Sequence, residues 1–145
     1  MVLTMFLLDT NVVSELRKAP GGKADPGVVA WARSVAVSSL YLSALSVYEL
    51  ELGVLAKERQ DPRQGALLRR WLDEQVLPGF AGRVLPLDLD VARRGAGLSV
   101  PDRVSERDGF IVATALVHRM TVVTRNTADF QRTGATLHNP WSRAP

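Results

Sequence analysis

Four acidic residues stand just after a predicted strand or at the start of a predicted helix. The first ends the apolar run in FLLDTNVVSEL and is followed by polar residues and a helical pattern. In a parallel sheet the carboxyl ends of the strands lie along one edge, so carboxylates placed just beyond several strands can meet in one crevice. The four residues are Asp9, Glu49, Asp108 and Asp129.

Carboxylates gathered in one crevice repel one another unless a cation is bound between them. Mg²⁺ and Mn²⁺ are hard ions that prefer oxygen ligands, so they suit such a cluster. When bound, ions of this kind neutralise phosphate and lower the pKa of an attacking water. The convergent arrangement therefore predicts metal-assisted hydrolysis of phosphodiester bonds.

A structural role for each acid stays open at this point. Asp9 could simply cap the helix that follows it. Each of the other three acids lies three residues after a capping-type residue, as in a capping box, where the positive end of the helix dipole favours an acid. The pairs are Glu49 with Ser46, Asp108 with Ser105, and Asp129 with Asn126.

Short apolar or β-branched runs alternate with longer segments of helical periodicity. Strands are predicted at residues 5–8, 40–45, 83–87, 121–124 and 135–138. Helices are predicted just after Asn11, at residues 26–36, 46–59, 62–76 and 108–118, and from Asp90 into the nineties, with Asp61 as an N-cap. Strands joined through helices form right-handed crossovers, so the pattern indicates an α/β fold of three layers, with a mostly parallel sheet of about five strands.

The composition is consistent with one domain over residues 1–145, without a disulfide framework or thiolate metal sites, because the chain has no cysteine. No apolar stretch approaches the roughly 20 residues needed to span a bilayer, and the start lacks the basic region of a secretory signal. We therefore expect a cytoplasmic protein that does not bind membranes. The net charge of +3 comes mainly from arginine, which is a weak indication of nucleic-acid binding.

Several stretches resemble the PIN-domain ribonucleases, and specifically the VapC-type toxins of bacterial type II toxin–antitoxin pairs. They are DTNVVSEL near the start, the central Glu49, the block RDGFIVATALVHRMTVVTRNTADF, and the closing TGATLHNPW. The likeness covers nearly the whole chain. It implies a PIN-like fold and an endoribonuclease toxin that arrests growth when it is free of its antitoxin.

The resemblance also implies roles for individual residues. It matches the four acids to positions that bind Mg²⁺ or Mn²⁺ and activate water, and it implies no other cofactor. Polar side chains near the acids would support the site. The acids are Asp9, Glu49, Asp108 and Asp129, and the supporting residues are Asn11, Thr124 and Asn126.

The partners implied by the resemblance are a VapB-type antitoxin, a second copy of the chain in a homodimer, and single-stranded or looped RNA. One departure from the family pattern is visible. An apolar or small residue is expected before the third acid, and this chain has Arg107 there. The departure affects local contacts rather than the identity of the acid.

Other interpretations stay open. In a non-catalytic α/β binding module, the acids would only cap helices while the surface docked RNA or a partner protein. An aspartyl-nucleophile phosphatase opening with D-x-D-x-T is disfavoured, because Asn11 replaces its second acid and Val13 its threonine. A histidine acid–base pair would need His118 and His138 to meet, and a second metal site would need Asp88 and Asp90.

Aromatic and basic residues complete the set of candidates. The three tryptophans are interpreted as packing residues rather than as platforms for bases. Four arginines close in sequence to the acids could supply counter-charge to an RNA backbone, although ordinary surface positions are the default explanation for them and at most two are expected to contact RNA. These residues are Trp31, Trp71 and Trp141, and Arg17, Arg103, Arg107 and Arg125.

Overall fold

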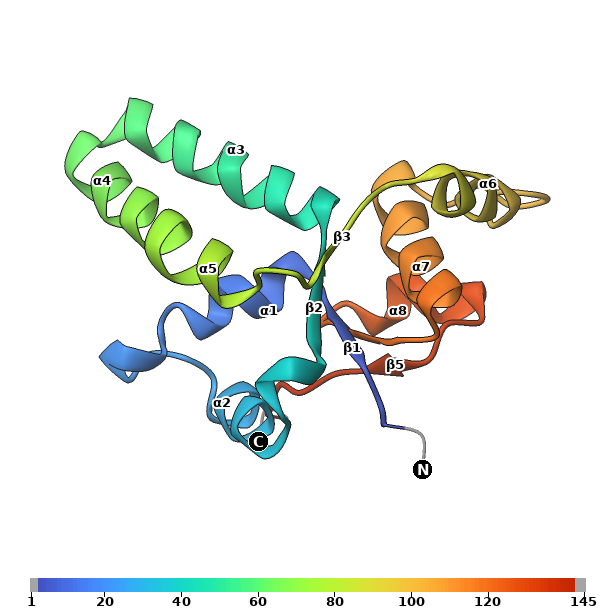
Figure 1. Ribbon diagram of the computed structural model, residues 1–145, viewed down its shortest axis with the longest axis horizontal. Coiled ribbons are helices and arrows are strands. Elements are labelled where there is room, and N and C mark those ends of the chain that lie inside the picture. The colour runs from blue at the N-terminus through green and yellow to red at the C-terminus, as the bar shows by residue number, and fades with distance from the viewer. Residues whose placement is uncertain (1–2, 143–145) are drawn as a thin grey trace.

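A five-stranded parallel sheet forms the centre of the computed structural model, which describes residues 3–142 (Figure 1). The strand order is β3-β2-β1-β4-β5, and every neighbouring pair runs in the same direction. The fold class predicted from the sequence is therefore confirmed. The strands are β1 (Phe6–Leu8), β2 (Leu40–Ser43), β3 (Val84–Leu85), β4 (Thr121–Val123) and β5 (Leu137–His138).

Helices connect the strands and cover both faces of the sheet. Figure 1 shows the long α3 and α4 side by side on one side of the strands, with α6 and α7 on the other. The α-helices are α1 (Thr10–Leu16), α2 (Pro26–Ser34), α3 (Ala44–Gln60), α4 (Pro62–Trp71), α5 (Leu77–Gly79), α6 (Leu89–Gly97), α7 (Glu106–His118) and α8 (Thr127–Phe130). Shorter turns of 3-10 helix are η1 (Ala19–Gly21), η2 (Val37–Ser39) and η4 (Gln131–Thr133), and η3 (Leu72–Val76) is π-helical.

The two faces of the sheet bury separate apolar clusters, because successive strand residues point to opposite faces. Leu8 of β1 and Val123 of β4 belong to the cluster beneath α1, α2 and α3. Leu7 and Val122 belong to the cluster beneath α7 and α8. This alternation makes the three layers that the apolar runs predicted.

The structure corrects several predicted boundaries. The strand predicted at residues 40–45 ends at Ser43, whose hydroxyl oxygen accepts a hydrogen bond from the Leu45 amide at 3.0 Å and caps α3. Ser46 therefore lies inside the first turn of α3, and the capping box of Ser46 with Glu49 is wrong. The predicted helix at 62–76 is α-helical only to Trp71.

The predicted cap at Asp61 is confirmed, whereas the Asn126 side chain makes no capping hydrogen bond to α8. Asp61 caps α4, with Pro62 in its first turn. Asp88 caps α6 by accepting a hydrogen bond from the Val91 amide at 3.0 Å, and Asp90 lies in the first turn. These two acids are therefore explained by the start of a helix.

The strand order creates a switch point between β1 and β4. From β1 the chain proceeds to β2 and β3 on one side, and it then returns to place β4 on the other side of β1. In open parallel sheets, ligands bind beyond the carboxyl ends of the strands at such a point. Asp9 and Thr124 directly follow the two strands that flank it.

Within residues 3–142, none of the helices combines the length and the apolar character needed to cross a membrane.

Candidate active site

Asp9 lies at the centre of the carboxyl edge of the sheet. It follows β1, caps α1 and is fully buried. One carboxylate oxygen, Oδ1, accepts a hydrogen bond from the Thr10 amide at 2.7 Å, and the other, Oδ2, accepts one from the Thr124 hydroxyl at 2.9 Å. Asp9 is thus both a helix cap and a member of a larger polar cluster, so the two interpretations of this acid do not exclude each other.

Glu49 reaches the same edge from α3. It lies beyond the first turn of that helix and is half-buried. Its Oε1 accepts a hydrogen bond from the Thr10 hydroxyl at 2.6 Å. Thr10 therefore joins the first two acids, since its amide contacts Asp9 and its hydroxyl contacts Glu49.

Asp108 reaches the edge from the first turn of α7. The Ser105 hydroxyl oxygen caps this helix by accepting a hydrogen bond from the Asp108 amide at 3.2 Å, as the capping box predicted. The Asp108 side chain nevertheless contacts Arg107, whose guanidinium donates to its Oδ1 at 3.1 Å. The backbone of Asp108 therefore serves the helix cap while its carboxylate joins the cluster.

Arg107 brings the three acids together. Its Nε donates to Glu49 at 2.6 Å, one terminal nitrogen donates to Asp108, and the other donates to Asp9. Burial opposes the charge of Arg107, but the hydrogen bonds to Glu49 and Asp9 outweigh it and raise the pKa of the guanidinium above its ordinary value. Three carboxylates from distant parts of the chain thus converge on one cationic group.

Thr124 is the best placed of the predicted supporting residues. It is fully buried, donates to Asp9, and accepts a hydrogen bond from the Asn126 amide at 3.0 Å. The Asn126 side chain forms no capping bond to α8. Asn11 lies in the first turn of α1, and its buried Oδ1 has no hydrogen-bond partner in the described part of the chain.

Asp129 stands apart from the other three acids. It is exposed in the first turn of α8, and its amide donates to the Asn126 carbonyl at 3.1 Å. Across residues 3–142, no hydrogen bond or ion pair joins its carboxylate to Asp9, Glu49 or Asp108. The structure thus joins three of the four predicted acids through one guanidinium.

An open groove of about 580 Å³ adjoins the carboxylate cluster. Polar residues at the start of α1 and Arg107 line its inner side. Arg125 also lines it and lies over the ring of Trp141, 5.5 Å from the ring centre. The basic and aromatic members of the lining are Arg17, Lys18, Arg107, Arg125 and Trp141.

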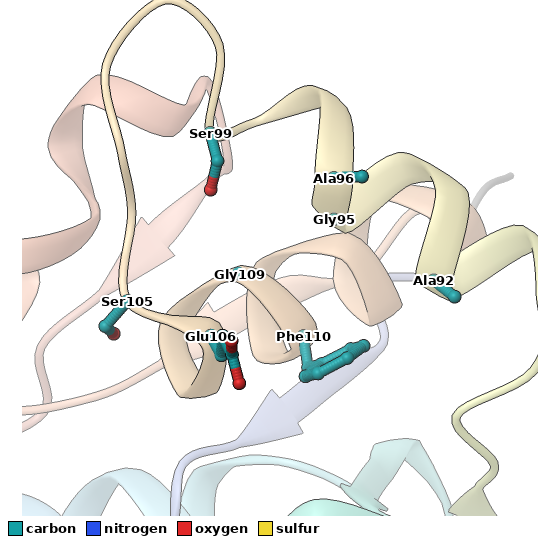
Figure 2. A pocket seen from close by; sticks show the side chains of 8 residues that line it. All are labelled: Ala92, Gly95, Ala96, Ser99, Ser105, Glu106, Gly109 and Phe110. Carbon is teal, nitrogen blue, oxygen red and sulfur yellow. The ribbon is translucent and has the colours of Figure 1, made fainter.

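A second hollow lies between α6 and α7 (Figure 2). Small residues of α6 such as Gly95 and Ala96 line it, together with Glu106 and Phe110 of α7. None of the four acids lines this hollow. It is therefore separate from the carboxylate cluster, although both adjoin the start of α7.

The histidines do not form an acid–base pair at this edge. His118 ends α7, roughly 15 Å along the helix axis from Asp108 at the rise of an α-helix. His138 lies in β5 and stacks on Trp31, with 5.6 Å between the ring centres. Trp31 also meets Phe6 edge to face, which agrees with its predicted packing role.

The carboxylate cluster offers oxygen ligands but not a ready-made site for a divalent ion. Among residues 3–142, no three acidic or imidazole side chains are placed so that they could share a metal ion directly. Three carboxylates nonetheless surround a single cation, and their oxygens are the ligands that Mg²⁺ and Mn²⁺ prefer. The residues therefore match such an ion in ligand type and charge, although they do not form a shared metal site while they surround the guanidinium.

Comparison with known proteins assigns the chain to a family. The profile of the family described as PIN domain matches residues 6–135. The chain therefore belongs to the PIN-domain family.

Individual relatives cover the chain almost end to end. The VapC ribonuclease Y4jK of Sinorhizobium fredii is 41% identical over 97% of this chain and all of that protein. The toxin FitB of Neisseria gonorrhoeae is 40% identical over 94% of this chain and 99% of that protein. The crystal structure of FitAcB from the same organism superposes with a TM-score of 0.85 at 38% identity, covering 94% of this chain and 99% of that chain.

Two functional contacts were missed by the sequence analysis. Thr10 was not singled out, although it bonds both Asp9 and Glu49. The sequence predicts that Arg107 affects local contacts or offers counter-charge to RNA, whereas in the structure it pairs with three acids. A basic residue directly beside a predicted metal-binding acid is a signal that could have identified the second contact.

Proposed function

We propose that this protein is a metal-dependent endoribonuclease toxin that hydrolyses RNA phosphodiester bonds and is held inactive by an antitoxin. The observation that supports the proposal most strongly is the meeting of Asp9, Glu49 and Asp108 around one cation at the carboxyl edge of the sheet. The similarity to a VapC ribonuclease and to a toxin over nearly the whole chain supports the same activity.

In this proposal Asp9, Glu49 and Asp108 hold Mg²⁺ or Mn²⁺, and Asp129 joins them as the fourth acid. When bound, the ion supplies charge neutralisation of the phosphate and lowers the pKa of an attacking water. The chain itself fixes the orientation of Asp9, since Thr10 and Thr124 each bond one of its oxygens. Thr10 also restrains Glu49, so two carboxylates are positioned before any ligand binds.

RNA suits the groove beside the cluster. Arg17 and Arg125 line it and supply counter-charge for a phosphate backbone, while Lys18 pairs with Glu15 in the same groove. Trp141 also lines the groove, with the Arg125 guanidinium over its ring. The proposed substrate class, single-stranded or looped RNA, rests on the resemblance to the PIN-domain ribonucleases.

The partners proposed are an antitoxin of the VapB type and a second copy of the chain, and the proposed compartment is the cytoplasm, where RNA is accessible. The support for the antitoxin is the similarity to a protein named as a toxin. A toxin that cleaves cellular RNA requires an inhibitor to be tolerated by its own cell.

RNA cleavage by the purified, antitoxin-free protein tests the activity. Cleavage is expected with Mg²⁺ or Mn²⁺ and is expected to stop when EDTA is added. Asp9→Asn and Asp108→Asn should each abolish cleavage, because each removes a carboxylate charge and changes little volume. His118→Ala, at the far end of α7, should retain most activity.

The same experiment tests the alternatives. Cleavage that continues at full rate in EDTA would contradict the metal mechanism. Binding of RNA without cleavage under any divalent metal would favour the non-catalytic binding module. Asp129→Asn is the test of the fourth acid: full activity in that variant would remove Asp129 from the proposed set.

A further inference from the structure

Arg107 contacts all three clustered acids with a single side chain. Each of its three guanidinium nitrogens pairs with a different carboxylate. Across residues 3–142, no other lysine or arginine forms an ion pair with Asp9, Glu49 or Asp108. The position of this one guanidinium therefore decides how these carboxylates are neutralised in the metal-free protein.

We propose that Arg107 is a displaceable internal counter-ion, whose guanidinium fills the carboxylate cluster in the metal-free protein and is expelled into the adjoining groove when a divalent ion binds. This inference rests on the proposed metal-dependent function and extends it to the regulation of the same site. It gives a role to Arg107, which stands where the family pattern has an apolar or small residue.

Guanidinium and metal exclude each other because they need the same oxygens. Oδ1 of Asp9 already accepts hydrogen bonds from both the Thr10 amide and Arg107. Oε2 of Glu49 and Oδ1 of Asp108 also face the guanidinium. A second cation among these atoms would lie within a few ångströms of the first and would be repelled.

The displaced Arg107 side chain can move into the adjoining groove. Arg107 lies in the first turn of α7, its side chain is 35% exposed, and it lines the groove that also holds Arg17 and Arg125. Movement into this groove requires a change of side-chain rotamer but no change in the helix. There the freed guanidinium can form a bidentate contact with an RNA phosphate.

The binding of metal and the binding of RNA are consequently coupled. The apparent metal affinity is the intrinsic affinity multiplied by the fraction of protein in which Arg107 does not fill the cluster. A phosphate that binds the freed guanidinium raises the metal affinity, and by reciprocity the metal raises the affinity for the phosphate. The Arg107 guanidinium therefore weakens metal binding until an RNA phosphate binds it.

Calorimetric titration of the purified protein with Mn²⁺ tests the competition. Arg107→Gln is expected to bind Mn²⁺ at least about tenfold more tightly than the wild type, because a competing charge in direct contact is removed. Arg125→Gln is the matched control: it removes an equal charge from the same groove, but Arg125 lies over Trp141 and not on the acids. Its Mn²⁺ affinity should stay within about twofold of wild type, since exposed charges are screened.

Arginine side-chain NMR of the wild type tests the displacement directly and does not depend on a variant that folds. The Nε–H signal of Arg107 should shift when saturating Mg²⁺ is added, because its hydrogen bond to Glu49 is lost. The signal is assigned by its absence from the Arg107→Gln spectrum, or by its proximity to Glu49 if that variant does not fold.

The outcomes separate the two proposals. If neither the wild type nor Arg107→Gln binds Mn²⁺, the proposed metal-dependent function fails and the Arg107 inference fails with it. If the wild type binds Mn²⁺ and Arg107→Gln binds it equally or more weakly, only the Arg107 inference is overturned. An Arg107 signal that is unchanged in Mg²⁺-saturated protein would overturn it in the same way.

Discussion

Thr124 shows how a single buried hydroxyl can hold a clustered carboxylate in place. It lies just beyond β4, donates to Oδ2 of Asp9 and accepts from the Asn126 amide. Both donor and acceptor functions of the hydroxyl are used, and the side chain is fully buried. The contact joins the ends of β1 and β4 across the switch point of the sheet.

Thr124→Val is expected to destabilise the protein by about 1–3 kcal/mol, because it keeps the side-chain shape but leaves a buried carboxylate oxygen of Asp9 and the Asn126 amide without this partner. RNA cleavage should fall with it, since Asp9 loses one of its restraints. Thr124→Ser keeps the hydroxyl and should retain most of the cleavage. Denaturant unfolding and a cleavage assay check the pair; equal cleavage by the two variants would contradict the role of the hydroxyl.

At the scale of elements, the packing of α3 against α4 helps to position Glu49 in the carboxylate cluster. The two helices approach so closely that Gly65 of α4 lies directly against the backbone of Glu58 in α3. Arg69 of α4 adds a bidentate ion pair to Glu51 of α3, at 3.0 and 2.5 Å, which lowers the pKa of Glu51. The close approach depends on the missing side chain of Gly65.

Gly65→Ala is expected to cost about 1–3 kcal/mol in the free energy of unfolding, as is typical when an added carbon is forced into a packed contact. A methyl carbon placed there would lie 2.3 Å from the Cα of Glu58, so α3 and α4 would have to separate.

Gly53→Ala is the matched control for the Gly65 prediction. Gly53 lies in the same helix pair, but nothing stands within 4 Å of the position that its added carbon would take. Its replacement should stabilise the protein by up to about 1 kcal/mol, because alanine favours a helix over glycine. Thermal unfolding of both variants checks the prediction, and equal stability changes would show that the contact with Glu58 carries no strain.

At the scale of the whole molecule, the site draws on widely separated parts of the chain. Asp9 follows the central strand, Glu49 comes from α3 on one face of the sheet, and Asp108 comes from α7 on the other face. Asp9 and Arg107 are 98 residues apart in sequence. Activity therefore requires the complete fold, and an isolated half of the chain would lack the site.

Expression of the protein alone in a bacterium is expected to arrest growth through cleavage of RNA. A small protein encoded beside it should relieve the arrest by direct binding. The control is Asp9→Asn, which should express to a similar level without arresting growth. Arrest by Asp9→Asn as strong as that by the wild type would contradict nuclease action as the cause.

The sequence by itself determined the succession of strands and helices along the chain, the parallel sheet, and the identity of the three acids that the structure brings together. These follow from local features: the apolar period of each segment, the capping residues, and the position of each acid next to a strand or helix end. The capping prediction failed at Ser46 because the helix begins two residues earlier than its apolar pattern indicates, at Ala44. The role of Asp129 stays a prediction.

Only the tertiary structure decided that the Arg107 guanidinium lies between the three acids. The position of Arg107 beside Asp108 is a local signal for a contact with that acid, but it does not indicate that Arg107 also reaches Asp9 and Glu49, which are 98 and 58 positions away from it. The contact depends on how β1, α3 and α7 pack around the switch point of the sheet. Local interactions select each element, but the distances between side chains on different elements are set by the close packing of the two apolar clusters that hold those elements together.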